Sequence, residues 1–176
     1  MDFVSTNAAA SRLCAECGLC CNGVIFHTVR LQPGDSARAL AALGLKLKRS
    51  NSRFSQPCTA YCDGLCSIYA QRPERCRRFE CRQLQHVARG EITETMALET
   101  IREVQRRAAE LDRLARRADG GPRQGPLAKR CETALAEPFD ATTHPELIAQ
   151  REILARELAE LDAMLDRDFR IPETDV

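Results

Sequence analysis

Nine of the ten cysteines in this chain lie between residues 14 and 81, where they form two blocks. The first block places four thiols within eight residues, Cys14-Ala15-Glu16-Cys17-Gly18-Leu19-Cys20-Cys21. The second block comprises Cys58, Cys62, Cys66, Cys76 and Cys81, whereas Cys131 stands alone. Thiols packed this densely in a chain without an export signal usually hold a metal. The first half of the chain is therefore expected to fold around metal ligands.

The rest of the composition favours helices. Ala and Leu dominate the apolar residues, and the chain has no Trp, two Tyr and six Phe. Such a composition suits helices better than sheets. We therefore predict a mainly α fold, with a cysteine-rich, metal-stapled N-terminal half that has little β-structure, followed by a helical hairpin or bundle. We place a metal-binding region at 10–90 and a helical region at 91–170, which together form one domain.

The N-terminus and the net charge limit the environment and the partners. Residues 1–7 lack a basic segment followed by an apolar core, so they do not resemble a signal peptide. No apolar run approaches the ~20 residues of a membrane span. We therefore expect a cytoplasmic protein without membrane contact, and the reducing cytosol favours metal over a disulfide scaffold. The formal net charge of +1 argues against a nucleic-acid partner.

Two apolar stripes predict the long helices of the second half. The first stripe has heptad spacing and consists of Ala97, Ile101, Val104, Ala108, Leu111, Ala115 and Ala118. The second consists of Leu147, Leu154, Leu158, Leu161 and Leu165. These spacings predict helices over 93–118 and 145–168 that pack antiparallel. We expect the same helices to offer a homodimer interface or a surface for a protein partner.

The first half has weaker local patterns. We predict a loose tail over 1–13, a strand over 24–31 from its β-branched residues, and a loop over 46–55. A short helix is expected to begin at Asp35 or Ser36, which can cap it, and to end at Gly44. A further helix is predicted over 79–89.

The spacing within the first block indicates how metal is bound. Cys14, Cys17 and Cys20 match the start of a ferredoxin-like run, but the local fourth cysteine that follows in ferredoxins is missing. A fourth ligand must come from the second block. Cys20 and Cys21 are adjacent, and neighbouring side chains in extended chain point to opposite faces. Two four-thiolate sites with one thiol to spare, and one four-cysteine cluster with a reactive remainder, both fit nine thiols.

The second block adds a specific resemblance to the first. Its segments Pro57-Cys58, Cys66-Ser67-Ile68-Tyr69, Arg72-Pro73 and Cys76-Arg77-Arg78-Phe79-Glu80-Cys81, in this order, resemble the CxxCxxCC family of zinc- or iron-chelating cysteine-cluster proteins, often labelled YkgJ-type. The resemblance implies metal binding by Cys14, Cys17, Cys20, Cys21, Cys58, Cys66, Cys76 and Cys81. Cys62 is additional to that pattern, and we keep it among the candidate ligands.

The same signature gives roles to its other residues. Tyr69 and Phe79 can shield a metal centre from water. Arg72 and Arg77 can donate to thiolates around it, which would offset the roughly −2 charge of a four-thiolate site. The cofactor is either an iron–sulfur cluster, such as 4Fe-4S, or Zn²⁺, since both accept four thiolates.

Three functions remain open on this sequence. The first is a cytosolic cysteine-cluster metalloprotein that joins its two segments through metal. The second is an iron–sulfur-dependent redox or methyl-transfer enzyme, because flagellin lysine methylases have a similar cysteine motif. The third is a zinc-stabilised adaptor with a helical partner-binding surface. No acid–base pair or phosphate-binding glycine loop is visible to favour the enzyme.

Overall fold

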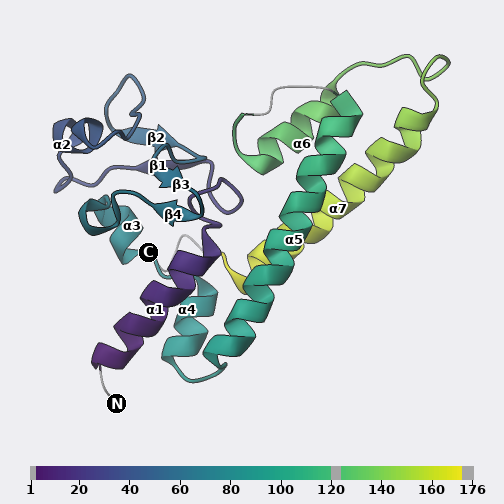
Figure 1. Ribbon diagram of the computed structural model, residues 1–176. Coiled ribbons are helices and arrows are strands. Elements are labelled where there is room, and N and C mark those ends of the chain that lie inside the picture. The colour runs from purple at the N-terminus through teal and green to yellow at the C-terminus, as the bar shows by residue number, and fades with distance from the viewer. Residues whose placement is uncertain (1–2, 120–123, 172–176) are drawn as a thin grey trace.

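Helices make up most of the fold, and the strands of the described residues form two small antiparallel pairs (Figure 1). The computed structural model describes residues 3–119 and 124–171. Its elements are α1 (Phe3–Cys17), β1 (Thr28–Arg30), α2 (Ala37–Ala42), β2 (Arg53–Ser55), β3 (Tyr61–Cys62), β4 (Leu65–Cys66), the short 3₁₀ helix η1 (Tyr69–Gln71), α3 (Glu74–Arg78), α4 (Arg82–Ala88), α5 (Glu94–Asp119), α6 (Leu127–Ala136) and α7 (Glu146–Asp168). The predicted mainly α fold is confirmed.

The long helix α5 is the axis of the second half, and α7 runs back beside it in the antiparallel direction (Figure 1). The Thr93 hydroxyl accepts from the backbone N–H of Met96 at 3.2 Å and caps α5 at its start. Arg107 of α5 bonds to Glu160 of α7 at 3.0 Å, on the outer edge of the contact. The predicted antiparallel pair is therefore present, with boundaries within one residue of those expected.

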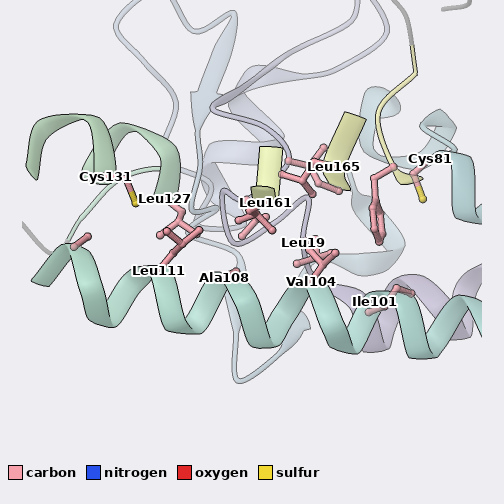
Figure 2. Packing of buried hydrophobic residues seen from close by; sticks show 14 of the residues in the cluster. Leu19, Cys81, Ile101, Val104, Ala108, Leu111, Leu127, Cys131, Leu161 and Leu165 are labelled. Carbon is pink, nitrogen blue, oxygen red and sulfur yellow. The ribbon is translucent and has the colours of Figure 1, made fainter. Parts of the chain in front are cut away.

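A single apolar core lies along α5, and we call it the helical core. All seven residues of the predicted α5 stripe are buried in it, together with Leu154, Leu161 and Leu165 of α7. Figure 2 shows Val104, Ala108 and Leu111 facing Leu161 and Leu127. The α5 stripe is covered within the chain, whereas Leu147 and Leu158 of the second stripe are only partly buried. A partner or homodimer surface on these helices stays a prediction.

The N-terminal segment differs from its prediction. Residues 3–13 are helical in α1 rather than a loose tail, because Leu13 is buried in the helical core and Ala10 packs against it. The Gln105 side chain of α5 also donates to the carbonyl oxygens of Glu16 and Cys17, both at 2.9 Å. The stabilisation of α1 therefore comes from α5, which lies too far along the chain for local sequence to reveal.

The β-structure also differs in detail from the prediction. The predicted strand over 24–31 is reduced to β1, and the predicted loop over 46–55 contains β2, which pairs with β1 at Thr28↔Ser55. Val24 and Ile25 are buried in the helical core instead of a sheet. The helix expected over 79–89 begins later, at Arg82. In each case a tertiary contact outweighed the local pattern.

A second, smaller core lies under the two strand pairs, and we call it the small core. It consists of Val29, Leu40, Leu45, Phe54, Ala60 and Ile68. The helix α2 joins it through Leu40, and Ser36 caps α2 by accepting from the N–H of Ala39 at 3.2 Å. Six buried residues make a weak core, so this part of the fold depends on further links.

Two stretches of the second half lie outside the described residues. The Gly/Pro-rich stretch between α5 and α6 and the last residues after 171 lie in part or entirely outside the described ranges. Among the helices within those ranges, none combines the length and apolarity that crossing a bilayer requires. The division of the chain at residues 90 and 91 stays a prediction.

Candidate metal centre

Both cysteine blocks open onto one cavity of about 1020 Å³. Eight thiol-bearing residues line it: Cys14, Cys17, Cys20, Cys21, Cys58, Cys66, Cys76 and Cys81. The other two cysteines are placed elsewhere. Cys62 is exposed on β3, with its Sγ 3.9 Å from the carbonyl oxygen of Thr59. Cys131 is buried between α6 and α5, at the opposite end of the helical core from Cys81 (Figure 2).

The first block straddles the end of α1. Cys14 and Cys17 lie in its last turns, and their three-residue spacing puts both on one face of the helix. Gly18 then takes φ +61° and ends the helix. The chain turns tightly, with the N–H of Cys21 donating to the Gly18 carbonyl at 2.9 Å. This turn carries Cys20 and Cys21 back toward the cavity.

Tyr61 packs on this turn, and no motif in the sequence analysis singled it out. A Cβ on Gly18 would lie 2.0 Å from the Tyr61 hydroxyl oxygen, so the ring packs directly on the glycine. Burial raises the pKa of Tyr61, and the thiols of Cys21 and Cys17 raise it further. The only sequence feature that marked this residue was its place inside the second cysteine block.

The second block reaches the cavity from four separate elements. Cys58 precedes the β3–β4 hairpin and donates its backbone N–H to the carbonyl of Cys21 at 2.8 Å. Cys66 lies in β4 and Cys76 in α3. Cys81 occupies the N-terminal cap position of α4. The missing fourth ligand of the first block thus has several candidates within one cavity.

Burial keeps these thiols protonated in the absence of metal. It raises the pKa of Cys17, Cys21 and Cys76 to about 12 each, and that of Cys81 to about 11. The thiol of Cys20 is also shifted well upward for the same reason, and the pKa shifts are increased by the neighbouring thiols. A cation entering the cavity would have to displace these protons.

Backbone N–H groups oppose this effect at three of the sulfurs. The N–H of Leu19 lowers the pKa of Cys17, and that of Ala60 lowers the pKa of Cys58. At Cys81 the N–H groups of Leu84 and Gln83 act in the same direction. Donors that face a sulfur stabilise its thiolate form. The cavity therefore offers both the soft ligands and the amide dipoles that thiolate metal sites use.

The thiols share the cavity without forming a finished site. Within residues 3–119 and 124–171, no three Cys, His, Asp or Glu side chains already converge at metal-ligating distances. Thiolates suit zinc and iron–sulfur clusters alike, so the donor set fits either group. The cysteine side chains would have to rotate for their sulfurs to converge on a metal, and the cavity has room for this rotation.

Comparison with known families agrees with this donor set. The model of the CxxCxxCC family, described as "Putative zinc- or iron-chelating domain", matches residues 13–113, more than half of the chain. The chain belongs to the CxxCxxCC family. No significant match was found among curated proteins or among solved structures. The YkgJ-type label is not part of that description and stays an expectation.

The CxxCxxCC match includes both cysteine blocks and ends inside α5, so α6, α7 and Cys131 lie beyond it. The family description supplies zinc or iron as the metal and gives no role, partner or cluster type. The lining of the cavity, rather than the family description, therefore indicates which residues hold the metal.

The rim of the CxxCxxCC cavity carries one of the two predicted arginines. Arg72 lines the cavity and stacks on Tyr69, with its guanidinium carbon 3.7 Å from the ring centroid. Arg77 is exposed on α3 and does not line the cavity. Phe79 packs edge-on against Phe26, with ring centroids 4.8 Å apart. Both aromatic residues of the signature thus border the cavity.

Proposed function

We propose that this CxxCxxCC protein binds zinc or an iron–sulfur cluster through thiolates drawn from the eight that line the cavity, and that the metal joins residues 14–21 to residues 58–81. The observation that carries the proposal is the shared cavity, which is lined by the eight thiols implied by the family resemblance and not by Cys62 or Cys131. Nothing else in the described chain requires these segments, which are separated by two strands and a helix, to expose sulfur to the same space.

The chain's own residues support this role in three ways. The amides near Cys17, Cys58 and Cys81 stabilise thiolates, as described above. The positive charge of Arg72 opposes the burial that raises the pKa of Cys14, Cys21 and Cys76. A bound metal would supply the remaining stabilisation of four negative sulfurs. We propose that Arg72 offsets the net negative charge that a four-thiolate site keeps.

The surrounding aromatic residues support the exclusion of water. Tyr61 covers the turn at Gly18, and Phe26 and Phe79 line the cavity and pack against each other. An apolar surround strengthens the attraction between a metal ion and its thiolates. It also slows oxidation of the sulfurs, which we expect to matter in a protein of the reducing cytosol.

The deciding experiment is anaerobic purification followed by metal analysis and a visible absorption spectrum. We expect at least about one equivalent of metal per chain. A brown protein with absorbance near ~400 nm would identify an iron–sulfur cluster. A colourless protein with tightly bound zinc would identify a zinc site.

Matched variants test the choice of thiols. Cys62→Ser and Cys131→Ser should retain the wild-type metal content, because neither side chain lines the cavity. Cys21→Ser should lower it. Less than one equivalent of zinc or iron in the wild-type protein would contradict the proposal.

A further inference from the structure

We propose that the eight thiols form two separate four-thiolate metal sites. One site consists of Cys14, Cys17, Cys20 and Cys81, which we call the α1-side set. The other consists of Cys21, Cys58, Cys66 and Cys76, which we call the hairpin-side set. The inference rests on the function proposed above and deepens it, because it assigns each thiol to a site.

The two apolar cores separate six of the eight thiols. Cys81 is part of the helical core, and Cys17 and Cys20 pack against that core. Cys58, Cys66 and Cys76 pack against the small core. No cysteine of the cavity packs against both. Each core therefore lies against one half of the cavity and packs against three of its cysteines.

The fourth member of the α1-side set is Cys14. It lies one helical turn before Cys17 on the same face of α1. The helix α1 also packs against α4, at whose first turn Cys81 stands. Cys14 thus faces the sulfurs that the helical core presents.

The fourth member of the hairpin-side set is Cys21. Its carbonyl accepts the backbone N–H of Cys58 at 2.8 Å, which fixes the two residues side by side. Cys58 packs against the small core together with Cys66 and Cys76. The hydrogen bond therefore connects Cys21 to the thiols of the small core rather than to α4.

The adjacent pair at positions 20 and 21 is the point where the two sets meet. Cys20 packs on the helical core, whereas Cys21 is bonded to the segment that precedes the hairpin. Their α-carbons are about 3.8 Å apart, as for any neighbouring residues. Two metal sites that share this dipeptide are therefore close neighbours. The positive charge of Arg72 acts on Cys14 of one set and on Cys21 and Cys76 of the other.

Four thiolates complete the tetrahedral ligand set of Zn²⁺ and the cysteine ligand set of a common iron–sulfur cluster. Each set thus fills one site without help from His, Asp or Glu. Cys62, the ninth thiol of the two blocks, is left outside both sets, because it does not line the cavity.

The test compares double variants that each remove two thiols. Cys14→Ser/Cys81→Ser removes two ligands from the α1-side set, and Cys58→Ser/Cys76→Ser removes two from the hairpin-side set. Cys14→Ser/Cys58→Ser removes one from each. The full-length chain is stripped of metal and reloaded under reducing, anaerobic conditions, with Zn²⁺ in one arm and with Fe²⁺ and sulfide in the other. Bound Co²⁺, whose spectrum reports the number of sulfur ligands, serves as the probe of complete sites.

Wild-type protein should bind two metal centres, each with four sulfur ligands. Either within-set double variant should keep half of the wild-type metal, and its Co²⁺ spectrum should still report one complete four-sulfur site. The cross-set double variant should retain no complete four-sulfur site, although it lacks the same number of thiols. Helix content measured by circular dichroism identifies any variant that has not folded, and Cys14→Ala/Cys17→Ala then replaces Cys14→Ser/Cys81→Ser.

Other outcomes overturn the assignment. One metal centre in the wild-type protein would leave the proposed function standing and remove the second site. A within-set double variant that loses all metal, or a cross-set variant that keeps a complete site, would show that the thiols are grouped differently. Absence of metal from the wild-type protein in both arms would contradict the proposed function as well.

Discussion

Gly18 is the residue on which the turn of the first cysteine block depends. Its backbone is left-handed, and the Tyr61 hydroxyl occupies the space that any side chain would need. A left-handed conformation costs a non-glycine residue about 1–2 kcal/mol before any clash is counted. The close contact also explains why a tyrosine stands among the cysteines of the second block.

Gly18→Ala should therefore destabilise the metal-free protein by more than about 2 kcal/mol, the sum of backbone strain and overpacking. It should also lower metal content, because Cys20 and Cys21 follow the turn. Chemical denaturation under reducing conditions measures the first effect and metal analysis the second. In a Tyr61→Ala background the added cost of Gly18→Ala should fall to about 1–2 kcal/mol. An unchanged cost in that background would show that Tyr61 does not press on the glycine.

The raised thiol pKa values predict how metal affinity depends on pH. Cys17, Cys21, Cys76 and Cys81 hold their protons far above neutral pH in the metal-free protein. Each must lose its proton on binding, so a fall in pH favours the metal-free form. Zn²⁺ affinity should weaken between about pH 8 and about pH 6, by up to about tenfold per pH unit for each proton released.

Competition with a chelator of known affinity at several pH values measures this slope, and a pH indicator in weak buffer counts the protons released. Affinity that is independent of pH across this range would mean that the thiols are already ionised, and it would contradict the pKa shifts assigned to burial.

At the scale of elements, the end of α7 is attached to the start of α4, next to Cys81. The N–H of Arg82 donates to the Phe169 carbonyl at 3.1 Å, and the Gln83 side chain donates to the Asp168 carbonyl at 3.0 Å. The Phe169 ring is 0% exposed in the helical core. The end of α7 therefore supports the start of α4 next to Cys81, a candidate ligand more than eighty residues earlier in the chain.

Phe169→Ala should cost about 3–5 kcal/mol of stability, the usual range for a buried aromatic residue. Metal held by the α1-side set should be lost before metal held by the hairpin-side set, because the support of α4 is weakened. Ile148→Ala on the same helix, where the side chain is 44% exposed, is the matched control and should cost less than about 1 kcal/mol. An equal loss of stability in the two variants would mean that the buried Phe169 stabilises the fold no more than the exposed Ile148 does.

Among the elements, the local sequence pattern was sufficient to predict the long helix α5. The α5 stripe repeats every three or four residues, and all seven of its members are buried as that period requires. The strand expected over 24–31 is shortened to β1, which is limited by its pairing with β2. The tail expected over 1–13 was wrong for residues 3–13, which are helical in α1, because α1 is held by Gln105. Elements with a long internal period could be predicted, whereas short elements depended on partners far along the chain.

At the scale of the whole molecule, the two cores differ greatly in size. The helical core extends along α5 and includes parts of α1, α4, α6 and α7, whereas the small core has six buried residues. A core that small gives little stability by itself. Metal bound between residues 58–76 and residues 14–21 would supply the stability that the small core lacks.

Removal of metal should therefore loosen one part of the molecule and not the other. After treatment with a chelator, backbone amides over residues 24–76 should exchange hydrogen much faster, while those of α5, α6 and α7 should stay protected. Hydrogen–deuterium exchange with mass spectrometry measures both regions in one sample. Unchanged exchange over residues 24–76 would show that the small core needs no metal, and equal loss of protection in α5 would show that the two cores unfold together.

The sequence by itself identified the candidate thiols and determined the long helices. The heptad period defines the buried side of α5, because it depends only on the regular rise and turn of a helix. The tertiary structure decided which distant residues meet. The packing of Tyr61 on Gly18 and the backbone hydrogen bonds of Cys58 with Cys21 and of Arg82 with Phe169 are contacts between segments 37 or more residues apart in the sequence. Packing of the two cores, rather than any local spacing, brings these segments together.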